Sequence, residues 1–364
     1  MKSNLQYDRL AEWLIRQMGN VDEVRLEEPE DLDFGHSAEM VALTLVSRRG
    51  GREHSQDVVV RLRPSEPGLL EPYDMRRQFD ILKALESTAV RSPRSLWIEP
   101  SGEVLGRPFF VMERVAGEVY ERHTPPESDE ELLRRMCGSM VTQLAAVHLV
   151  DLEATGLSRL GEGHTFLDRE LERWAGEMRR VQRGPLPAME RMLEQLRLQQ
   201  PEPCERIALV HGDPKPGNFA FLDDEVSAVF DWELADVGDP LADIGYLEIL
   251  WAMPVGITSK RSSLTVEEFV ALYEECTGIR VRHRPWYRAM QVFKICVIQL
   301  IGSMLFDAGH WDDLRAIDMA HGIQRMVPMG LADLGVTDSP ELGPVFPRRE
   351  RQEEARKRLS VSPR

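Results

Sequence analysis

Four polar residues in one short stretch combine functional groups that rarely occur together by chance. The segment His211-Gly-Asp213-x-Lys215-x-x-Asn218 supplies a carboxylate, an ammonium group and an amide, and Asp231 follows thirteen positions after Asn218. A carboxylate at the end of a loop can orient an acceptor hydroxyl and take its proton. Amide and carboxylate oxygens are protein ligands that Mg²⁺ accepts. The stretch therefore offers a candidate base, a cation and two candidate metal ligands.

Phosphoryl transfer needs this combination of groups. The triphosphate must be held by magnesium, and charge on the γ-phosphoryl group must be balanced by the metal and by Lys or Arg. In this interpretation Asp213 and Lys215 are catalytic, and Asn218 and Asp231 bind the metal. Each residue taken singly is explained as well by a hairpin with polar turns. The four together at fixed spacing favour the functional interpretation.

Short apolar runs on both sides of these residues predict the strands that position them. They are 207–211, 219–222 and 226–230, the last two forming a hairpin. Further strands are expected at 40–47, 57–63 and 108–114, and helices at 74–85 and 166–199. Ser128 and Glu131 have the spacing of a capping box in front of another helix, and Val292–Leu305 is interpreted as a core helix.

These elements predict an α+β fold with two lobes. Residues 1–114 are expected to form a small antiparallel-sheet lobe that binds nucleotide, with an N-terminal helix. Residues 115–346 should form a larger, mostly helical lobe for catalysis and substrate binding. The charged, apolar-poor stretch 347–364 is predicted to be disordered. The junction near residue 115 is a natural place for a ligand cleft.

The segment 207–245 resembles the catalytic loop and metal-binding aspartate of the aminoglycoside phosphotransferase family, which has a protein-kinase-like fold. HGDPKPGN matches the HGDxxxxN form of that family. The resemblance implies ATP (or GTP) and Mg²⁺ as cofactors, Asp213 as the base, and a structural role for His211. VVVRLRP and VDLEATGL are most similar to the subgroup related to acyl-CoA dehydrogenase family members 10 and 11. A hydroxyacyl compound or an aminoglycoside-like molecule is then the expected acceptor.

The same resemblance assigns expected nucleotide contacts in the first 115 residues. Gly35 and Ser37 lie where a loop covers the ATP phosphates, although a plain turn explains them nearly as well. Arg61 takes the place of the strand lysine that grips the phosphates, or is a solvent-facing arginine. Glu113 and Val115 belong to a strand that presents backbone groups to adenine.

The partner of Arg61 departs from the family pattern. The helix that should supply a glutamate has Gln78 at that position, and a glutamine can accept a hydrogen bond from Arg61 but cannot form an ion pair with it. Glu71 is an alternative partner. Elsewhere, His148 is expected to be buried and hydrogen-bonded, and Asp239 and Asp243 to brace the catalytic loop.

Composition narrows the classes of function. The 364 residues carry 61 acidic and 45 basic side chains, a formal charge of −16, which argues against a nucleic-acid binder. Four dispersed cysteines argue against a zinc site or a disulfide framework. The N-terminus does not read as a signal peptide and no run is long and apolar enough to cross a membrane, so a cytoplasmic protein is expected.

Two classes of function stay open on this sequence. One is an active small-molecule kinase that phosphorylates a hydroxyl. The alternative is a catalytically weak or inactive nucleotide-binding regulatory module, suggested by Arg61 and Gln78. A protein kinase is disfavoured because Asp231-Trp232-Glu233 replaces the usual Asp-Phe-Gly. The oligomeric state is not predicted.

Overall fold

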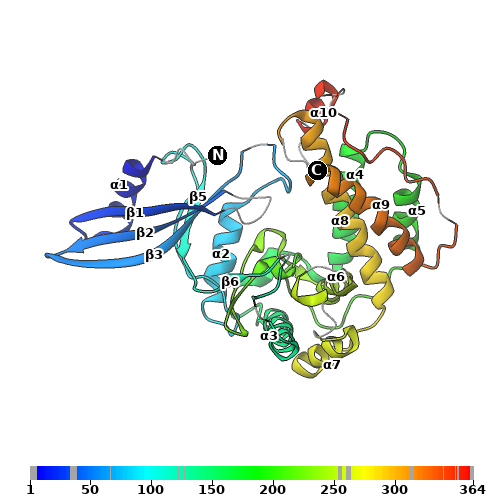
Figure 1. Cartoon of the computed structure of the whole chain (residues 1–364), viewed down its shortest axis with the longest axis horizontal. Coiled ribbons are helices and arrows are strands. Elements are labelled where there is room, and N and C mark those ends of the chain that lie inside the picture. Colours follow the sequence, from blue (N-terminus) through cyan, green and yellow to red (C-terminus); the bar gives the residue numbers. More distant parts are fainter. Residues whose placement is uncertain are drawn as a thin grey trace.

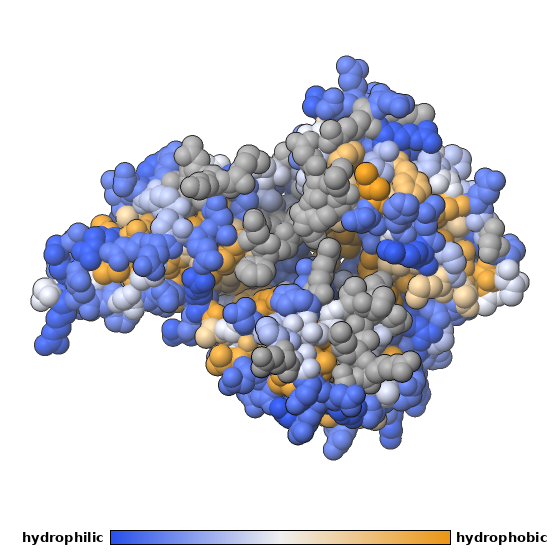
Figure 2. Space-filling model, viewed as in Figure 1, coloured by the Kyte–Doolittle hydropathy of each residue, from blue (hydrophilic) through white to orange (hydrophobic). Residues whose placement is uncertain are grey.

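A computed structural model of the chain has a small sheet-based lobe beside a larger helical lobe (Figure 1). It describes residues 6–32, 39–65, 67–121, 123–126, 128–252, 256–259, 264–311, 315–338, 340–348, 350 and 352–360. The mixture of an antiparallel sheet and many helices confirms the α+β class. Hydrophilic residues cover most of the described part of the face in Figure 2, as the acidic composition predicts.

The small lobe is built on an antiparallel sheet of five strands in the order β1-β2-β3-β5-β4. The strands are β1 (Glu23–Leu32), β2 (Glu39–Arg49), β3 (Arg52–Leu62), β4 (Ser95–Glu99) and β5 (Phe109–Glu113). The expected strands correspond to β2, β3 and β5. Strand β1 gives little sequence signal because most of it is exposed, and its residues are largely charged.

The two faces of this sheet have different neighbours. Helix α1 (Tyr7–Met18) covers one face and helix α2 (Met75–Leu85) lies on the other (Figure 1). Because side chains alternate along a strand, Val58, Val60 and Leu62 of β3 pack in the cluster with α1. Val59 and Arg61 consequently point to the opposite face, toward α2 and the helical lobe.

The helical lobe contains most of the remaining elements. Its helices are α3 (Glu130–His148), α4 (Phe166–Val181), α5 (Pro187–Leu198), α6 (Leu241–Ala252), α7 (Val266–Thr277), α8 (Arg284–Ala308), α9 (Arg315–Asp333) and α10 (Gln352–Leu359). Its short strands are β6 (Glu118–Val119), β7 (Ala208–Val210), β8 (Phe219–Leu222), β9 (Glu225–Val229) and β10 (Asp236–Gly238). Single 3₁₀ turns occupy Leu157–Leu160, Gly163–Thr165, Pro216–Asn218, Trp232–Leu234 and Ile257–Ser259.

Two local predictions about helices were wrong. The helix expected over 166–199 is two helices, α4 and α5, because Gly184 and Pro185 interrupt it and Pro187 starts the second. The predicted capping box at Ser128 is also displaced. The residue that caps α3 is Asp129, whose carboxylate accepts a 2.7 Å hydrogen bond from the N–H of Leu132.

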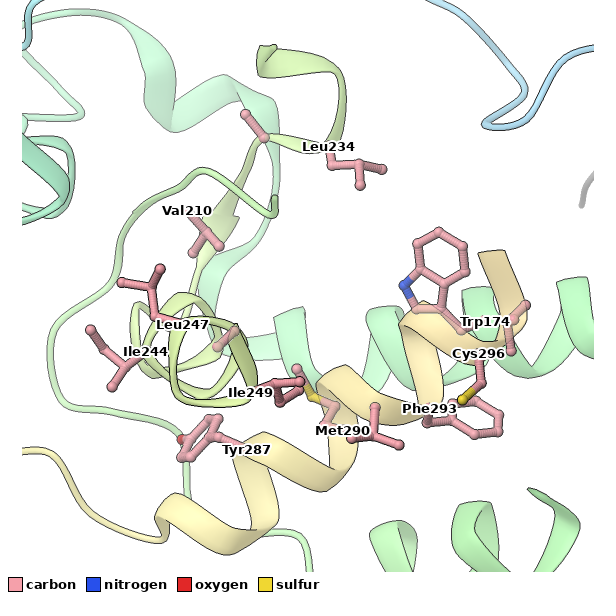
Figure 3. Packing of buried hydrophobic residues seen from close by; sticks show 14 of the residues in the cluster. Trp174, Val210, Leu234, Ile244, Leu247, Ile249, Tyr287, Met290, Phe293 and Cys296 are labelled. Atoms are coloured by element: carbon pink, nitrogen blue, oxygen red, sulfur yellow. The ribbon is translucent and has the colours of Figure 1, made fainter. Parts of the chain in front are cut away.

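Helix α8 runs through the centre of the helical lobe (Figure 3). Phe293 and Cys296 lie beside Trp174 of α4, and Tyr287 and Met290 face α6 at Ile244 and Ile249. Among the described helices, α8 is the one whose length and apolar character would suit a membrane span, but 83% of its most apolar window is buried inside the protein. The core-helix interpretation of Val292–Leu305 therefore agrees with the structure.

The charged tail differs from the prediction of disorder. Residues Gln352–Leu359 form α10, whose Ala355 and Leu359 are buried. Arg356 donates a 2.9 Å hydrogen bond to the carbonyl oxygen of Ala308, at the end of α8. Two buried apolar side chains, together with hydrogen bonds from Gln352, Arg356 and Arg358 to backbone carbonyl oxygens, dock a short helix whose composition alone indicates disorder.

Candidate active site

The loop that follows β7 carries Asp213 and is fixed by buried hydrogen bonds. The Asp243 carboxylate accepts from the backbone N–H of His211 at 2.7 Å and of Gly212 at 2.9 Å. The ring of His148 lies 3.0 Å from the same carboxylate, and its other nitrogen lies 2.7 Å from the Tyr273 hydroxyl. Asp243 thus braces the loop from α6, and His148 is buried and hydrogen-bonded.

His211 and Gly212 shape the loop rather than face a cavity. His211 is fully buried; its Nδ1 accepts from the N–H of Asp213 at 3.2 Å and its Nε2 lies 2.8 Å from the Phe230 carbonyl oxygen. Gly212 has a φ of 84°, and a Cβ there would lie 2.5 Å from the carbonyl oxygen of Leu234. The sequence His-Gly at this point is therefore a structural requirement of the loop.

The carboxylate of Asp213 is surrounded by donors. The Tyr246 hydroxyl donates to its Oδ1, the Asn218 Nδ2 donates to its Oδ2 at 3.1 Å, and the Lys215 ammonium lies 3.3 Å from Oδ2. Burial would raise the pKa of Asp213, but Lys215 and the Tyr246 hydrogen bond outweigh it, and the net pKa is lowered. The carboxylate is therefore ionised at neutral pH, as a base must be.

Asn218 and Asp231 are brought together by the β8–β9 hairpin. Phe219 pairs with Val229, and the N–H of Phe230 donates to the carbonyl oxygen of Asn218 at 2.8 Å. Asn218 directs its NH₂ group to Asp213, so its amide oxygen accepts no hydrogen bond from any described residue. Asp231 has a φ of 65°, the left-handed conformation, in which its carboxylate lies on the cavity wall.

This donor set fits magnesium. One amide oxygen and one carboxylate leave room for phosphate oxygens and water, which is how Mg²⁺ is usually held. Within the described ranges, no cluster of three or more His, Cys, Asp or Glu side chains forms a dedicated metal cage. A site of this kind takes its metal together with a phosphate ligand.

Arg61 is buried at the site and its ion-pair partners are not those expected. Its Nη2 donates to Asp231 Oδ1 at 2.7 Å and lies 3.4 Å from Glu233 Oε2. Burial lowers the pKa of Arg61, but Asp231 and Glu233 raise it by more, so the guanidinium stays charged. Gln78 lines the same cavity without a hydrogen bond to Arg61. The alternative partner Glu71 instead accepts from the N–H of Gly68 and lies 3.8 Å from Arg63.

A cavity of about 370 Å³ lies between the two lobes and collects most of the candidate residues. Its apolar walls include Val59, Leu82 and Met112 from the small lobe, and Ala220 and Trp232 from the helical lobe. Its polar wall contains Arg61, Lys215, Asn218 and Asp231, and the strand end supplies Glu113 and Val115. The N–H of Glu113 already donates to the carbonyl oxygen of Arg94 at 3.0 Å, whereas the N–H of Val115 donates to none of the described residues.

Two other candidate residues, Gly35 and Ser37, lie outside the described residues.

Sequence reasoning missed the contacts of Glu233 and Lys294. Lys294 donates from α8 to the Gly212 carbonyl oxygen at 2.7 Å. Glu233 lies 172 positions from Arg61, and Lys294 lies 82 positions from Gly212, so no local sequence motif predicts these contacts.

Comparison with known proteins agrees with this geometry. The model of the phosphotransferase enzyme family (APH) matches residues 35–285, which include every site residue predicted from the sequence. The chain belongs to this family. Membership of this family supports a small-molecule phosphotransferase activity.

Two acyl-CoA dehydrogenase family members are among the relatives that are similar to this chain. The chain is 30% identical over 256 residues to mouse acyl-CoA dehydrogenase family member 10, covering 67% of this chain and 24% of that protein. It is 28% identical over 287 residues to human acyl-CoA dehydrogenase family member 11, covering 72% of this chain and 36% of that protein. The chain therefore spans only about a quarter to a third of these relatives.

Solved structures confirm the fold. A protein from Ralstonia eutropha, described as a candidate aminoglycoside phosphotransferase, superposes with a TM-score of 0.74 at 25% identity, covering 91% of this chain and 99% of that one. Aminoglycoside phosphotransferase APH(4)-Ia in complex with ADP and hygromycin B superposes with a TM-score of 0.58 at 16% identity, with the same coverage. The chain therefore has the kinase-like fold of these proteins.

Proposed function

We propose that this protein transfers the γ-phosphoryl group of ATP, with Mg²⁺, to a hydroxyl group of a small molecule. The observation that carries the proposal is one cavity whose polar end combines Arg61, Lys215, Asn218 and Asp231 beside an apolar slot. The apolar slot suits a purine, and the polar end suits a triphosphate.

Asp213 is the proposed general base. The acceptor hydroxyl gives its proton to the Asp213 carboxylate while its oxygen forms a bond to the γ-phosphorus. The bond between that phosphorus and the bridging oxygen breaks, and ADP leaves with the electron pair. The lowered pKa of Asp213 keeps the carboxylate ionised before this step. Lys215, whose pKa is raised by Asp213, stays protonated and can offset charge on the phosphoryl oxygens.

Arg61 is the proposed grip on the phosphates. It is 6% exposed, and among the described residues its Nε has no hydrogen-bond partner and its Nη1 has the Met40 sulfur at 3.8 Å as its one polar contact. Buried N–H groups without partners cost free energy unless a ligand accepts from them. An anionic phosphate at the polar end of the cavity would satisfy them.

Asn218 and Asp231 would hold Mg²⁺ through the amide oxygen and the carboxylate. Bound there, the metal supplies charge neutralisation for the phosphates. The amide oxygen of Asn218 is available for this because its NH₂ group is already engaged by Asp213.

A thermal-shift experiment tests the proposal. The melting temperature is measured with Mg²⁺ alone, ATP alone and both, for wild type and Asp231→Asn. A ligand at a hundredfold its dissociation constant stabilises by about 2.7 kcal/mol, which a melt detects. We expect the largest shift with both ligands and its loss in Asp231→Asn. Asp223→Asn, an exposed turn residue of the same hairpin, is the matched control. The absence of any shift with Mg-ATP or Mg-GTP would reject the proposal.

A screen that measures ATP consumption with different candidate molecules would identify the phosphoryl acceptor. Hydroxyacyl compounds come first because the chain is similar to acyl-CoA dehydrogenase family members, and aminoglycosides such as hygromycin B come next. One acceptor that raises ATP consumption severalfold, with loss of this gain in Asp213→Asn, would support the kinase. Tight Mg-ATP binding without turnover on any acceptor would favour the alternative, an inactive nucleotide-binding regulatory module. In that case the replacement of the usual glutamate by Gln78 would accompany the loss of catalysis.

A further inference from the structure

Both acidic partners of Arg61 come from the loop after β9 in the helical lobe, whereas in protein kinases the strand lysine is paired with a glutamate on a helix of the small lobe. We infer that Glu233 is the positioning residue that keeps Arg61 in place when Asp231 turns to the metal ion. The inference rests on the proposed function, since it concerns the same nucleotide site. Glu233 would do from the helical lobe what Gln78 on α2 cannot do.

The three side chains form a compact buried group. The side chains of Arg61 and Glu233 are each 7% exposed and that of Asp231 is 15% exposed. One nitrogen, Nη2 of Arg61, serves both carboxylates, at 2.7 Å for Asp231 and 3.4 Å for Glu233. The shorter contact belongs to the residue that is also the proposed metal ligand.

Asp231 cannot serve two cations equally well. Mg²⁺ demands close, nearly octahedral oxygen contacts, and drawing the Asp231 carboxylate toward it weakens the contact with Arg61. A buried arginine left without a counter-charge is strongly destabilised. Glu233 removes this conflict because its carboxylate remains on Nη2 whichever way Asp231 turns.

The backbone around Glu233 is well fixed. Glu233 lies in the 3₁₀ turn Trp232–Leu234, whose Trp232 is 2% exposed and packs 4.8 Å from the ring of His211. Helix α2, in contrast, gives this loop a cation. Arg77 donates to the Ala235 carbonyl oxygen at 2.9 Å and to Asp236 at 3.1 Å. Helix α2 therefore contributes a cation, Arg77, to its contact with the helical lobe, and the acid that pairs with Arg61 comes from the helical lobe as Glu233.

The test compares ATP binding with and without metal, by titration calorimetry on the whole protein in Mg²⁺ or in EDTA. In Glu233→Gln we expect the dissociation constant of Mg-ATP to rise about tenfold, which equals about 1.4 kcal/mol. The dissociation constant of metal-free ATP should change less than about threefold, because Asp231 still holds Arg61. Glu71→Gln is the matched control, since Glu71 faces Arg63 just beyond the same strand.

Two further variants show whether Glu233 acts through Arg61. In an Arg61→Ala background, Glu233→Gln should have no additional effect on Mg-ATP binding. Gln78→Glu in the Glu233→Gln background should recover most of the lost affinity. An equal loss with and without metal, an undiminished effect in Arg61→Ala, or no recovery from Gln78→Glu would overturn the inference. If wild type binds no Mg-ATP, the proposed function itself has failed, which is a distinct outcome.

Discussion

The Lys294 ammonium donates a 2.7 Å hydrogen bond to the backbone carbonyl oxygen of Gly212, the residue immediately before Asp213. Lys294 is 3% exposed and belongs to the central helix α8. Its charge is partly balanced by Glu170 at 3.7 Å, and it lies 5.7 Å from the centre of the Trp174 ring. The core of the helical lobe is thus connected directly to the catalytic loop.

Lys294→Met should destabilise the protein by about 2–4 kcal/mol, because it leaves the buried Gly212 carbonyl without its donor and removes a nearby positive charge from Glu170. Denaturant unfolding measures the loss. Lys83→Met, at a position 61% exposed, should change the free energy of unfolding by less than about 0.5 kcal/mol. If the Lys294 variant is as stable as wild type, the ammonium does not hold the loop.

Asp213→Asn should abolish turnover and spare nucleotide binding. A positioned base contributes about 10²–10⁴-fold to rate, so kcat should fall by at least about a hundredfold. The dissociation constant of Mg-ATP should stay within about threefold, since the proposed grip and metal ligands are Arg61, Asn218 and Asp231. Asp223→Asn should retain full turnover. A parallel loss of binding and turnover in Asp213→Asn would contradict the role of base.

Tyr246→Phe should shift the pH dependence of the reaction. The Tyr246 hydroxyl donates to Asp213 and is one cause that lowers the pKa of that carboxylate, after Lys215 and against burial. Removing it leaves burial less opposed, so the pKa of Asp213 should rise. The acidic limb of the kcat/KM profile should therefore move to higher pH, which initial rates across a pH series would reveal. A limb that stays in place or moves down would show that Tyr246 does not tune the base.

Asp243→Asn should reduce the free energy of unfolding by about 2–4 kcal/mol. An amide keeps one acceptor oxygen but presents an NH₂ group to backbone N–H donors in a buried site. Denaturant unfolding tests this, with Asp224→Asn as the surface control, because Asp224 pairs with Arg135 at an exposed position. Equal stabilities of the two variants would contradict the bracing role.

Asp243 should also account for part of the loss of folding stability at acid pH. Burial would raise the pKa of Asp243, but the His148 hydrogen bond and nearby positive charge outweigh burial, and the net pKa is lowered. A lowered carboxyl pKa stabilises the folded state above the ordinary value near 4, and this contribution is lost as the pH falls through the folded pKa. Wild-type stability should therefore fall below about pH 4 more steeply than that of Asp243→Asn. Parallel slopes in unfolding measurements would reject this assignment.

The amino-acid sequence by itself determined the local parts of the site. The order His211, Asp213, Asn218 and Asp231 is fixed by one loop and one hairpin, so short-range spacing suffices to predict that these side chains meet. Alternation along β3 also places Arg61 on the face opposite Val58 and Val60, but the sequence left open whether that face bounds the cavity or faces solvent. The α8 core helix was also predictable, because its apolar run Val292–Leu305 is too short for a membrane span and contains Lys294 and Gln299.

Only the tertiary structure decided which distant groups complete the site. Glu233 is 172 residues from Arg61, and Lys294 is 82 residues from Gly212. Such contacts depend on how two lobes and several helices pack, and spacing along the chain carries no information about that packing. The same physical reason explains the docked helix α10: local charge predicts disorder, whereas burial of Ala355 and Leu359 against the helical lobe stabilises the helix.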